Sequence, residues 1–505
     1  MNASAQTAGP LDVLVIGAGF GGLAMANALR KIRGLRFHVL EKERGLGGAW
    51  RDNTYPGCAC DIPSHLYSLS FAPNAEWSQL YAPQPEILSY MERLAETHGL
   101  RRFVTFGAGV AALSWDREAQ HWLVKLSNGE TRRSRFVVSA MGVLHHPAVP
   151  RLDGLENFRG KVFHSSRWDH SYDLAGKRVA VLGTGASAIQ FVPQIVDRVA
   201  GLMLFQRTAP WIVPKTGRVF GAWRRRLFRH LPFYRRHFRN RLFWAHEKRA
   251  LGFHRQDPAI LARTEKLCRD LLARQVKDEA LRARLTPDYR VGCKRLLISS
   301  DYYPALQRAN ARLVTDPIAR VEPDAIVTRD GVRHPCDAII FGTGFDIEAS
   351  IGDVRIKGAE GRDLGEIWRE EGASAYLGTM VAGFPNLFFI TGPNAGSGHN
   401  SQLFMIEAQT RYIVSAIAQA RRMGLGALDV KPSVQQAFAD ELERRMTQTV
   451  WAAGGCKSWY QDGVTGRNRV LWPGFSLDYW WRTRRAALAD FSCAPVLSRR
   501  MRESV

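Results

Sequence analysis

The stretch Asp12-Val-Leu-Val-Ile-Gly-Ala-Gly-Phe-Gly-Gly22 decides the fold of this chain, because a short apolar run passes directly into closely spaced glycines. It predicts a buried strand, a tight turn and a helix, followed by a second strand at residues 37–41. In this Gly-x-Gly-x-x-Gly pattern Gly17 makes the turn, Gly19 lets the backbone approach a pyrophosphate, and Gly22 lets helix and strand pack closely. The βαβ unit therefore predicts a dinucleotide-binding fold of the Rossmann type.

A second copy of the pattern begins at the strand Arg178–Leu182. The following Gly183-Thr-Gly-Ala-Ser-Ala188 is Gly-x-Gly-x-x-Ala, an accepted variant of the fingerprint. The copies differ 24 residues after their first glycine, where one has Glu41 and the other has Arg207. An acid suits a ribose 2′-hydroxyl, and a guanidinium suits a 2′-phosphate. We therefore expect two dinucleotides, one like FAD and the other NADP rather than NAD.

The composition is that of a globular protein large enough for two or three domains, with 505 residues of which 46% are hydrophobic. The net charge of +23 is compatible with nucleic acid, an anionic membrane, an anionic ligand or solubility alone. The first apolar run lacks the features of a secretory signal, and the uncharged stretch at residues 372–406 is interrupted by Gly, Pro, Asn and Ser. We therefore expect a cytoplasmic protein without a membrane span.

The seven cysteines are scattered, and Cys58 and Cys60 form Cys-x-Cys rather than Cys-x-x-Cys. This pattern disfavours a disulfide framework, a redox pair and a zinc site, so we expect no metal and a reducing compartment. Two adjacent histidines, His145 and His146, follow the first fold. We expect their side chains to diverge and their roles to be structural.

Residues 45–70 combine glycines, proline and large aromatic residues in one irregular stretch. Gly47-Gly48-Ala49-Trp50 is followed by Tyr55-Pro56-Gly57, and then by Asp61 and Tyr67. A surface loop rich in Pro and Gly is the simpler alternative, but it would carry fewer large aromatics. We therefore expect a loop that is folded against a ligand.

Between the two copies lies Phe158-Arg-Gly-Lys-Val-Phe-His-Ser-Ser-Arg-Trp-Asp169, which is neither an apolar strand nor a clean amphipathic helix. Gly160 permits unusual backbone angles, a histidine such as His164 can titrate near neutral pH, and Trp168 is a large rigid ring. By itself, the segment predicts a connector with packed aromatic residues.

From residue 215 to about 285 the pattern is helical and basic, and arginines alternate with aromatic residues. We expect a helical cap with an apolar inner face, interrupted at Pro232. Nucleic acid is not an expected partner, and weak peripheral contact of residues 215–260 with an anionic membrane is the alternative. Farther on, Lys294 and Arg295 stand beside an apolar strand, where they would neutralise a phosphate or a developing anion; an ordinary surface pair is the simpler explanation.

Further core strands near residues 136–142, 338–346 and 387–393, and a helix at 402–416, complete the expected architecture. It is an α/β fold with two Rossmann-like dinucleotide-binding domains, for FAD and NADPH, and a helical insertion in the NADPH domain. The expected division is FAD-binding domain, first part, 1–150; NADPH-binding domain, first part, 151–213; helical insertion, 214–291; NADPH-binding domain, second part, 292–377; FAD-binding domain, second part, and C-terminal region, 378–505.

Two of these segments resemble signatures of a known family. The joining segment has the pattern Phe158-x-Gly160-x-x-x-His164-x-x-x-Trp168, and the aromatic loop has Gly47-Gly48-x-Trp50-x-x-x-x-Tyr55-Pro56-Gly57-x-x-x-Asp61. Both are similar to patterns of type I Baeyer–Villiger monooxygenases, which are FAD- and NADPH-dependent class B flavoproteins. Trp168 stands where flavin-containing N- and S-oxygenases have Tyr or Phe, so the resemblance favours the former family.

The resemblance implies roles for individual residues. Arg295 would be the active-site arginine and Asp61 its orienting carboxylate, and Phe158, Gly160, His164 and Trp168 would mark the domain joint. The implied cofactor contacts are Gly17, Gly19, Gly22, Glu41, Trp50, Asp61 and Tyr67 for FAD; Gly183, Gly185, Ser187, Arg207, Thr208, Lys294 and Trp459 for NADPH; and Val110, Thr184, Gln190, Arg295 and Gln402 for one or other cofactor.

The resemblance also implies the chemistry. NADPH would reduce FAD, and O2 would add to give a flavin C4a-peroxide that attacks a ketone carbonyl and yields an ester or lactone. Arg295 would stabilise the peroxide anion and the tetrahedral adduct, while Asp61 fixes its direction. The partners would be O2 and a small ketone or related carbonyl compound; the substrate itself and the oligomeric state stay open.

Three other functions stay open from the sequence. A flavin-containing N- or S-oxygenase shares both folds and differs in its product. A flavin disulfide reductase is disfavoured, because no Cys-x-x-Cys follows the first fold. A basic membrane- or nucleotide-binding protein with an inactive flavin fold would stay colourless when FAD is added.

Overall fold

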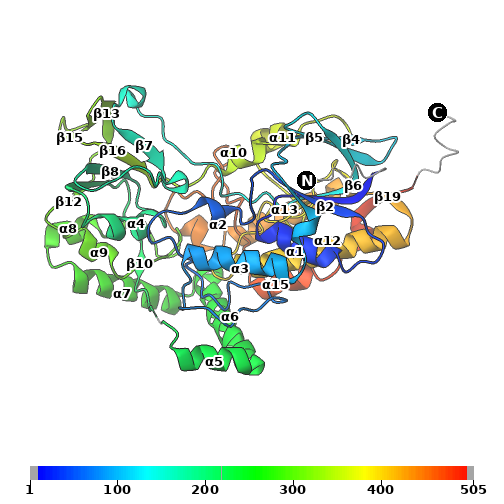
Figure 1. Cartoon of the computed structure of the whole chain (residues 1–505), viewed down its shortest axis with the longest axis horizontal. Helices are drawn as coiled ribbons and strands as arrows, with labels where there is room; N and C mark the ends of the chain where they lie inside the picture. The colour runs from blue at the N-terminus through cyan, green and yellow to red at the C-terminus, as the bar shows by residue number, and fades with distance from the viewer. Residues whose placement is uncertain (1–9, 218, 497–505) are drawn as a thin grey trace.

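In the computed structural model, which describes residues 10–217 and 219–496, two mainly parallel sheets lie toward opposite ends of the molecule (Figure 1). The first sheet has the strand order β17-β4-β5-β6-β1-β2-β3, with β18 paired to β6. Its strands are β1 (Leu11–Ile16), β2 (Phe37–Glu41), β3 (Val104–Phe106), β4 (Val110–Asp116), β5 (His121–Leu126), β6 (Thr131–Ser139), β17 (Arg355–Lys357) and β18 (Leu387–Phe389).

The first sheet is built around the parallel strands β1, β2 and β6, whose aliphatic residues are almost completely buried. Two helices, α1 (Phe20–Leu29) and α12 (Gln402–Arg422), pack against each other and share this core. A third helix, α3 (Gln84–Thr97), covers the same cluster. The βαβ unit predicted from the first fingerprint is confirmed, and the burial of its apolar residues is its main source of stability.

The second sheet is entirely parallel, with the order β12-β9-β8-β16-β7. Because side chains alternate along a strand, Val179 and Val181 pack with α4 (Ala188–Ile195) and α9 (Tyr302–Ala305). The alternate residues of the same strand pack with β13 (Ile318–Glu322) and β14 (Ala325–Thr328). The strands of this sheet are β7 (Lys161–His164), β8 (Arg178–Leu182), β9 (Gly201–Phe205), β12 (Ala311–Val314) and β16 (Ala338–Phe341).

The joining segment differs from the expected connector. Residues Lys161–His164 form β7, the edge strand of the second sheet, which pairs in parallel with β16. The strand has four residues, of which Lys161 and His164 are polar, so it carries no apolar run that would stand out in the sequence. An edge strand tolerates such a composition, because one of its sides has no neighbouring strand.

The helical insertion consists of α5 (Ala222–His230), α6 (Pro232–Arg255), α7 (Pro258–Gln275) and α8 (Glu279–Arg284). Pro232 stands in the first turn of α6, where its missing N–H is tolerated, and it separates α6 from α5 as predicted. On the inner face of α6, Phe238 packs against the first core, and the Arg239 guanidinium donates to the carbonyls of His65 and Ser68 at 3.0 and 2.7 Å. A short sheet of β10 (Ile212–Val213) and β11 (Leu297–Ile298) closes the base of the insertion.

Smaller elements complete the fold. Strand β17 (residues 355–357) belongs to the first sheet, where it pairs with β4. The chain therefore returns to the first sheet before residue 378, where the sequence placed the start of the second part of the FAD-binding domain. Within the described residues, no helix is long and apolar enough to cross a membrane. The remaining elements are α2 (Ala49–Asp52), η1 (Arg101–Phe103), η2 (Leu155–Asn157), η3 (Ser165–Arg167), β15 (Arg333–Pro335), α10 (Ile347–Gly352), α11 (Leu364–Glu371), β19 (Leu425–Val430), α13 (Pro432–Met446), α14 (Val450–Ala453), α15 (Ser476–Arg482), η4 (Leu488–Asp490) and β20 (Phe491–Pro495).

Two chain segments that join the sheets run side by side, since the Asp346 N–H donates to the carbonyl of His146 at 2.9 Å. The expectation that His145 and His146 diverge is wrong. Their Nε2 atoms lie 3.1 and 2.6 Å from the two carboxylate oxygens of Asp353. Both rings turn toward this acid, which arrives from a distant part of the sequence. The ion-pair contacts with Asp353 account for this cluster of three residues. The nitrogen and carboxylate oxygen atoms of the cluster lie within 4.8 Å of one another, a spacing that a metal site would also have.

The cysteine pattern disfavoured a disulfide framework, yet one pair of cysteines is joined. Cys293 and Cys456 form a disulfide, and their Cα atoms are 6.1 Å apart, which is within the usual range. The two residues are separated by 163 positions, so no local spacing pointed to them. The free cysteines of the described chain are Cys58, Cys60, Cys268, Cys336 and Cys493.

Candidate active site

The first glycine fingerprint forms a turn that admits no side chain. Gly17 has a φ of +99°, and a Cβ added there would lie 2.6 Å from the carbonyl oxygen of Ala140. A Cβ on Gly22 would lie 1.9 Å from the carbonyl oxygen of Gly17, because the start of α1 lies so close to the turn. Both distances are far shorter than a van der Waals contact, so these two positions require glycine.

Beyond the turn, two glycine backbones approach each other closely. Gly19 and Gly48 face each other, and a Cβ on Gly48 would lie 3.3 Å from the Cα of Gly19. Glu41 is almost completely buried at the end of β2, and its carboxylate accepts a hydrogen bond from the Ala18 N–H at 2.7 Å. Backbone without side chains at a helix N-terminus, beside a fixed carboxylate, fits the pyrophosphate and ribose of FAD.

Trp50 and Tyr67 form an aromatic pair near these glycines. Trp50 follows Gly48 by two residues. The Trp50 Nε1–H donates to the Tyr67 hydroxyl at 3.0 Å, and the ring centroids are 5.7 Å apart. Burial raises the pKa of Tyr67, so its hydroxyl stays protonated. The hydrogen bond fixes two aromatic rings where they could contact a flat ring system such as a flavin.

Arg295 and Asp61 form a bidentate ion pair between the two folds. Arg295 Nε and Nη2 donate to the two carboxylate oxygens of Asp61 at 2.5 and 2.8 Å. The charge of Asp61 raises the pKa of Arg295 above its already high ordinary value. Burial alone would raise the pKa of Asp61, but the charge and hydrogen bonds of Arg295 outweigh burial and lower that pKa. Both groups are therefore ionised at neutral pH, and the guanidinium plane has a fixed direction.

The second fingerprint repeats the geometry of the first. Gly183 has a φ of +103°, and a Cβ there would lie 2.6 Å from a carbonyl oxygen of the loop after β16. The Thr184 hydroxyl donates to the Thr208 carbonyl at 3.0 Å and so ties this turn to the residues that follow β9. Gly185 and Ser187 immediately precede α4. The N–H groups at this helix N-terminus fit a second pyrophosphate, that of NADPH.

Arg207 and Lys294 are two neighbouring cations without an ion-pair partner in the described part of the chain. Arg207 is exposed, and the Lys294 ammonium lies 4.8 Å from the centre of the Tyr289 ring. Burial, and then the positive charge of Arg207, lower the pKa of Lys294. A bound anion would relieve this repulsion, so the pair fits a 2′-phosphate.

Gln190 links the two folds. Its Oε1 accepts a hydrogen bond from the Tyr55 hydroxyl at 3.0 Å, and its Nε2 donates to the Ala59 carbonyl at 3.0 Å. A cavity of about 460 Å³ lies at this link, and its wall includes Tyr55, Cys58, Gln190, Lys215 and Asp301. The joint between the folds therefore has room for a ligand that extends from one fold to the other.

A second cavity, of about 350 Å³, extends to Trp459. Trp459 is 47% exposed, and its ring centroid lies 4.6 Å from that of the buried Tyr460. Burial raises the pKa of Tyr460, and the nearby charge of Arg295 opposes this effect. The cavity therefore lies close to the ion pair. Its largely apolar wall includes Met141, Val143, Phe345, Ile347, Phe389 and Trp459.

Two of the expected cofactor residues are held by the protein itself. Gln402 is the first residue of α12; its Oε1 accepts from the Ser397 N–H at 2.8 Å, and its Nε2 donates to the Ala395 carbonyl at 3.1 Å. Val110 begins β4 and packs, half-buried, against the core of the first sheet. In this structure Gln402 shapes the loop before α12, and contact of either residue with a cofactor stays a prediction.

The signature residues of the joining segment are packed tightly. A Cβ on Gly160 would lie 2.5 Å from the ring of Phe158, so the ring requires glycine opposite it. His164 is buried, and its Nδ1 accepts a hydrogen bond from the Ser166 N–H at 3.1 Å. Burial lowers the pKa of His164 to about 4, so the ring is neutral at physiological pH. This residue orders the local chain rather than carrying a charge.

Trp168 belongs to a row of rings that reaches the first fold. Its ring centroid lies 5.2 Å from that of Phe163 and 5.3 Å from that of Phe191 on α4. Phe191 in turn lies 6.1 Å from Tyr55, in the aromatic loop of the first fold. The two signature segments are therefore connected through the Phe191 ring, which contacts Trp168 on one side and Tyr55 on the other.

Sequence reasoning missed a buried polar network beside the site. Glu247 of α6 lies 3.0 Å from His399 Nε2 and accepts a hydrogen bond from the Asn400 amide at 2.7 Å. Burial lowers the pKa of His246 to about 4, and the charge of Asp61 opposes this, so His246 lies near the ion pair. The available signal was Glu247 itself, the one acid in the otherwise basic sequence of α6.

Comparison with known proteins covers nearly the whole chain. The family of NAD(P)-binding Rossmann-like domains matches residues 15–83, and that of L-lysine 6-monooxygenase/L-ornithine 5-monooxygenase matches residues 77–214. A Baeyer-Villiger monooxygenase of Pseudomonas aeruginosa is 48% identical over 472 residues, which are 94% of this chain and 88% of that protein. Another, of Streptomyces coelicolor, is 45% identical over 480 residues, 95% of this chain and 92% of that protein.

Solved structures share the complete arrangement. A cyclohexanone monooxygenase from Rhodococcus sp. Phi1 bound to NADP+ matches with a TM-score of 0.84 and 27% identity, over 96% of this chain and 100% of that one. OTEMO in complex with FAD and NADP matches with a TM-score of 0.86 and 26% identity, again over 96% and 100% of the two chains. The glycine turns and the cation pair thus occur in a fold that in OTEMO binds both FAD and NADP.

Proposed function

Since the chain belongs to the Baeyer–Villiger monooxygenases, flavin-dependent enzymes that use NADPH, we propose that it inserts one oxygen atom of O2 next to the carbonyl of a ketone. The product is an ester or a lactone. The observation that carries the proposal is the bidentate pair of Arg295 and Asp61 between the two nucleotide folds. A fixed cation at this place suits a reaction in which negative charge develops on oxygen.

A bound FAD would supply the redox chemistry that activates O2, with NADPH as the source of electrons. The chain itself contributes binding, orientation and charge. Arg295 holds a positive charge beside the oxygen atoms that become negative, and Asp61 keeps the guanidinium in one direction. The buried Tyr460 and the apolar cavity wall exclude water on one side, which strengthens the electrostatic effect of Arg295.

We propose that Arg207 and Lys294 bind the 2′-phosphate of NADPH and so select it over NADH. The support is that two cations lie near each other at a partly buried place: burial, and then the charge of Arg207, lower the pKa of Lys294, while the charge of Asp288 opposes them. The glycine turn at Gly183 lies at the start of the same fold and would receive the pyrophosphate.

We propose that the ketone binds in the cavity of about 350 Å³ that Phe345 and Trp459 help to line. A mainly apolar wall suits the hydrocarbon part of a ketone, and the polar residues of the lining suit the carbonyl. Trp459, at 47% exposure, would form part of the cavity mouth. Arg295 would face the carbonyl oxygen from beside Tyr460.

A screen of NADPH oxidation over cyclic, linear and aryl ketones, with mass analysis of the products, tests this function. We expect oxidation that depends on the ketone and a product that is one oxygen atom heavier. Amines and thioethers belong in the same screen, because the lysine and ornithine monooxygenase family matches residues 77–214. Oxidation of nitrogen or sulfur alone would favour the N- or S-oxygenase function. A protein that stays colourless with FAD would favour the inactive flavin fold.

We also propose weak contact of residues 215–260 with an anionic membrane surface. Three large side chains of α5 and α6 face solvent, with exposed fractions of 67% for Trp223, 70% for Phe233 and 53% for Trp244. The helix α5 projects from the molecule beside α6 (Figure 1). Aromatic rings among cations suit the interface of an anionic bilayer. The exposed cations on the same helices include Arg226, Arg236, Arg241 and Lys248.

Vesicle flotation tests the membrane contact. The protein should float with anionic vesicles at low salt, stay behind with neutral vesicles, and be released by high salt. A Trp223→Ala/Phe233→Ala double variant should bind less. Absence of flotation at low salt would leave the helical cap as the role of this region. The cytoplasmic location stays a prediction that cell fractionation tests.

A further inference from the structure

The disulfide joins the two segments that carry the candidate catalytic and coenzyme residues. Cys293 directly precedes Lys294 and Arg295, and Cys456 stands three residues before Trp459. Neither segment is close to the other in the sequence, so the covalent bond fixes a distance that the fold alone would set through weaker contacts. This placement distinguishes the pair from the scattered free cysteines.

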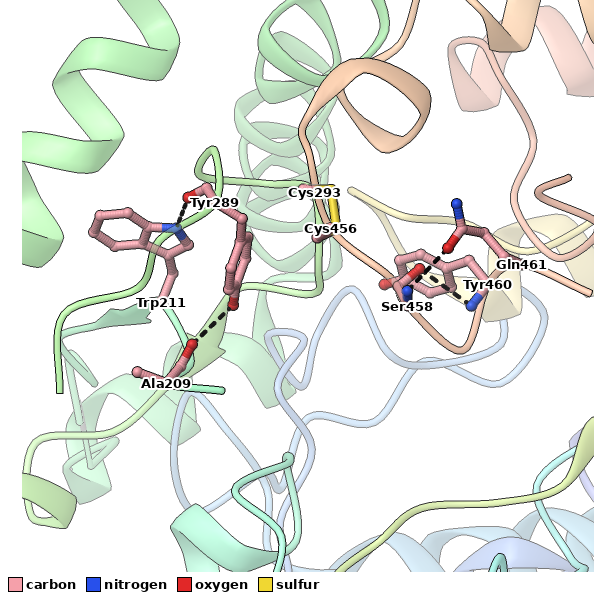
Figure 2. Close-up of a disulfide and its surroundings, with 8 residues drawn as sticks. All are labelled: Ala209, Trp211, Tyr289, Cys293, Cys456, Ser458, Tyr460 and Gln461. Atoms are coloured by element: carbon pink, nitrogen blue, oxygen red, sulfur yellow. Dashed lines mark hydrogen bonds between the residues drawn. A yellow bond between two sulfur atoms is a disulfide. The ribbon is translucent and has the colours of Figure 1, made fainter. Parts of the chain in front are cut away.

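The segment that carries Cys293 is held in place by hydrogen bonds of buried side chains. The Trp211 Nε1–H donates to the Tyr289 carbonyl at 2.8 Å, and the Tyr289 hydroxyl donates to the Ala209 carbonyl at 3.2 Å (Figure 2). Cys293 is completely buried in the same cluster. These bonds hold the end of the helical insertion against the chain that follows β9.

The Cys456 side is an exposed loop whose hydrogen bonds are mostly local. The Ser458 N–H donates to the Gln461 side chain at 3.1 Å, and the Ser458 hydroxyl accepts from the Tyr460 N–H at 3.3 Å (Figure 2). A backbone hydrogen bond from the Arg290 N–H to the Gly454 carbonyl, at 3.0 Å, connects the loop to the segment that carries Cys293. Within this loop the exposed residues are Gly455, Lys457 and Trp459.

We propose that the Cys293–Cys456 disulfide positions the Trp459 loop beside Arg295, and that thiol–disulfide exchange at this bond controls the affinity for NADP(H). The inference rests on the proposed function, since it assigns Lys294 and Trp459 to the coenzyme. With the bond closed, the loop is already ordered when the coenzyme arrives. With the bond open, binding must also order the loop, and the lost conformational entropy weakens affinity.

The exchange step uses a dithiol as the reductant. One of its thiolates attacks the Sγ of the half-buried Cys456, forms a mixed disulfide and releases Cys293 as a thiolate, which takes up a proton. The second thiolate of the dithiol then attacks the mixed disulfide, closes a ring and releases Cys456, which is also protonated. Two electrons and two protons have passed from the dithiol to the cysteines, and a small disulfide such as oxidised glutathione reverses the reaction.

The test compares the FAD-loaded protein before and after treatment with dithiothreitol, and alkylation followed by mass analysis reports the state of the bond. Calorimetric titration measures the affinity for NADP+, and hydrogen exchange reports the opening of residues 454–461. Reduction should weaken NADP+ binding by about tenfold and increase exchange in this loop, with FAD content unchanged. Reoxidation with oxidised glutathione should restore both values.

Two variants sharpen the test. C293A/C456A should bind NADP+ as weakly as the reduced protein and should not respond to dithiothreitol, whereas Cys493→Ala, at an exposed free cysteine, should respond like the wild type. If the double variant does not fold, the NADP+ affinity of the reduced wild-type protein tests the proposal by itself. Unchanged NADP+ affinity after the mass shows an open bond overturns the proposal. If reduction weakens NADP+ binding as expected but the protein oxidises no ketone, the proposed function is wrong and the role of the disulfide is supported.

Discussion

Asp61 and Arg295 are 234 positions apart in the sequence, yet two hydrogen bonds of 2.5 and 2.8 Å join their side chains. Asp61 belongs to the aromatic loop of the first fold, and Arg295 to the segment that follows the helical insertion. The pair therefore forms only when both folds are correctly placed. It couples the assembly of the two nucleotide folds to the placement of the charge that we propose for the reaction.

Replacing Arg295 by alanine should abolish ester formation while FAD stays bound. Loss of one preorganised electrostatic contact lowers a rate by about 10²–10³-fold. FAD absorbance and product yield measure the two effects separately. The matched control is Arg290→Ala, because Arg290 is exposed and bonds only to Gln256 among the described side chains. Near wild-type ester output from Arg295→Ala would exclude the assigned role.

Replacing Arg207 by alanine should weaken the use of NADPH far more than that of NADH. A charged hydrogen bond contributes about 1.5–3 kcal/mol, which corresponds to about 10- to 150-fold in KM for NADPH. Steady-state kinetics with both coenzymes measure the difference. Arg312→Ala, an exposed arginine on β12 of the same sheet, should change neither value. An equal effect of Arg207→Ala on both coenzymes would refute the phosphate contact.

Gly22→Ala should lose FAD and lower the melting temperature. Its Cβ would lie 1.9 Å from the carbonyl oxygen of Gly17, so the backbone of the fingerprint turn would have to move. Overpacking of this kind costs about 1–3 kcal/mol or more. Gly352→Ala is the control, since a Cβ there meets nothing within 4 Å. Thermal unfolding and the ratio of flavin to protein absorbance check both variants, and normal flavin content in Gly22→Ala would contradict the close packing.

His65→Phe should reduce the acid sensitivity of the fold. His65 lies among Phe220, Phe228 and Phe238, and burial lowers its pKa to about 3. Because this value lies below the unfolded pKa of about 6.5, the unfolded state binds the proton first. The contribution to stability is therefore complete above about pH 6.5 and is lost as pH falls toward 3.

Melting temperatures at pH values of about 7, 6 and 5 measure this effect, because these values run from the range of full stability into the range where it is being lost. The His65→Phe variant should lose less stability between the highest and lowest pH than the wild type. His237→Phe, at an exposed histidine of α6, should keep the wild-type slope. Parallel curves for His65→Phe and the wild type would show that His65 does not titrate as described.

The parts of the fold that the sequence predicted are those encoded by neighbouring residues. The turns at Gly17 and Gly183 could be predicted because each fingerprint specifies its own backbone geometry within a few positions. Pro232 likewise marked the start of α6 through its missing N–H. Such local rules need no knowledge of the tertiary structure.

The parts that were missed depend on partners far away in the chain. Asp353 turns two adjacent histidines toward one acid, and Cys456 completes a bond with a cysteine 163 positions earlier. The strand β7 needs β16 beside it before its short, polar sequence becomes a strand. The pairing of Arg295 with Asp61 came only from family resemblance, since neither residue carries a local signal for the other.

The most direct test of the central claim is the product that the wild-type protein forms from a ketone with FAD, NADPH and isotopically labelled O2. We predict an ester or lactone with one labelled oxygen atom, and one NADPH consumed for each product molecule. The claim would be contradicted if the ketone stayed unchanged while NADPH and labelled O2 were converted to hydrogen peroxide, or if label entered only nitrogen and sulfur compounds.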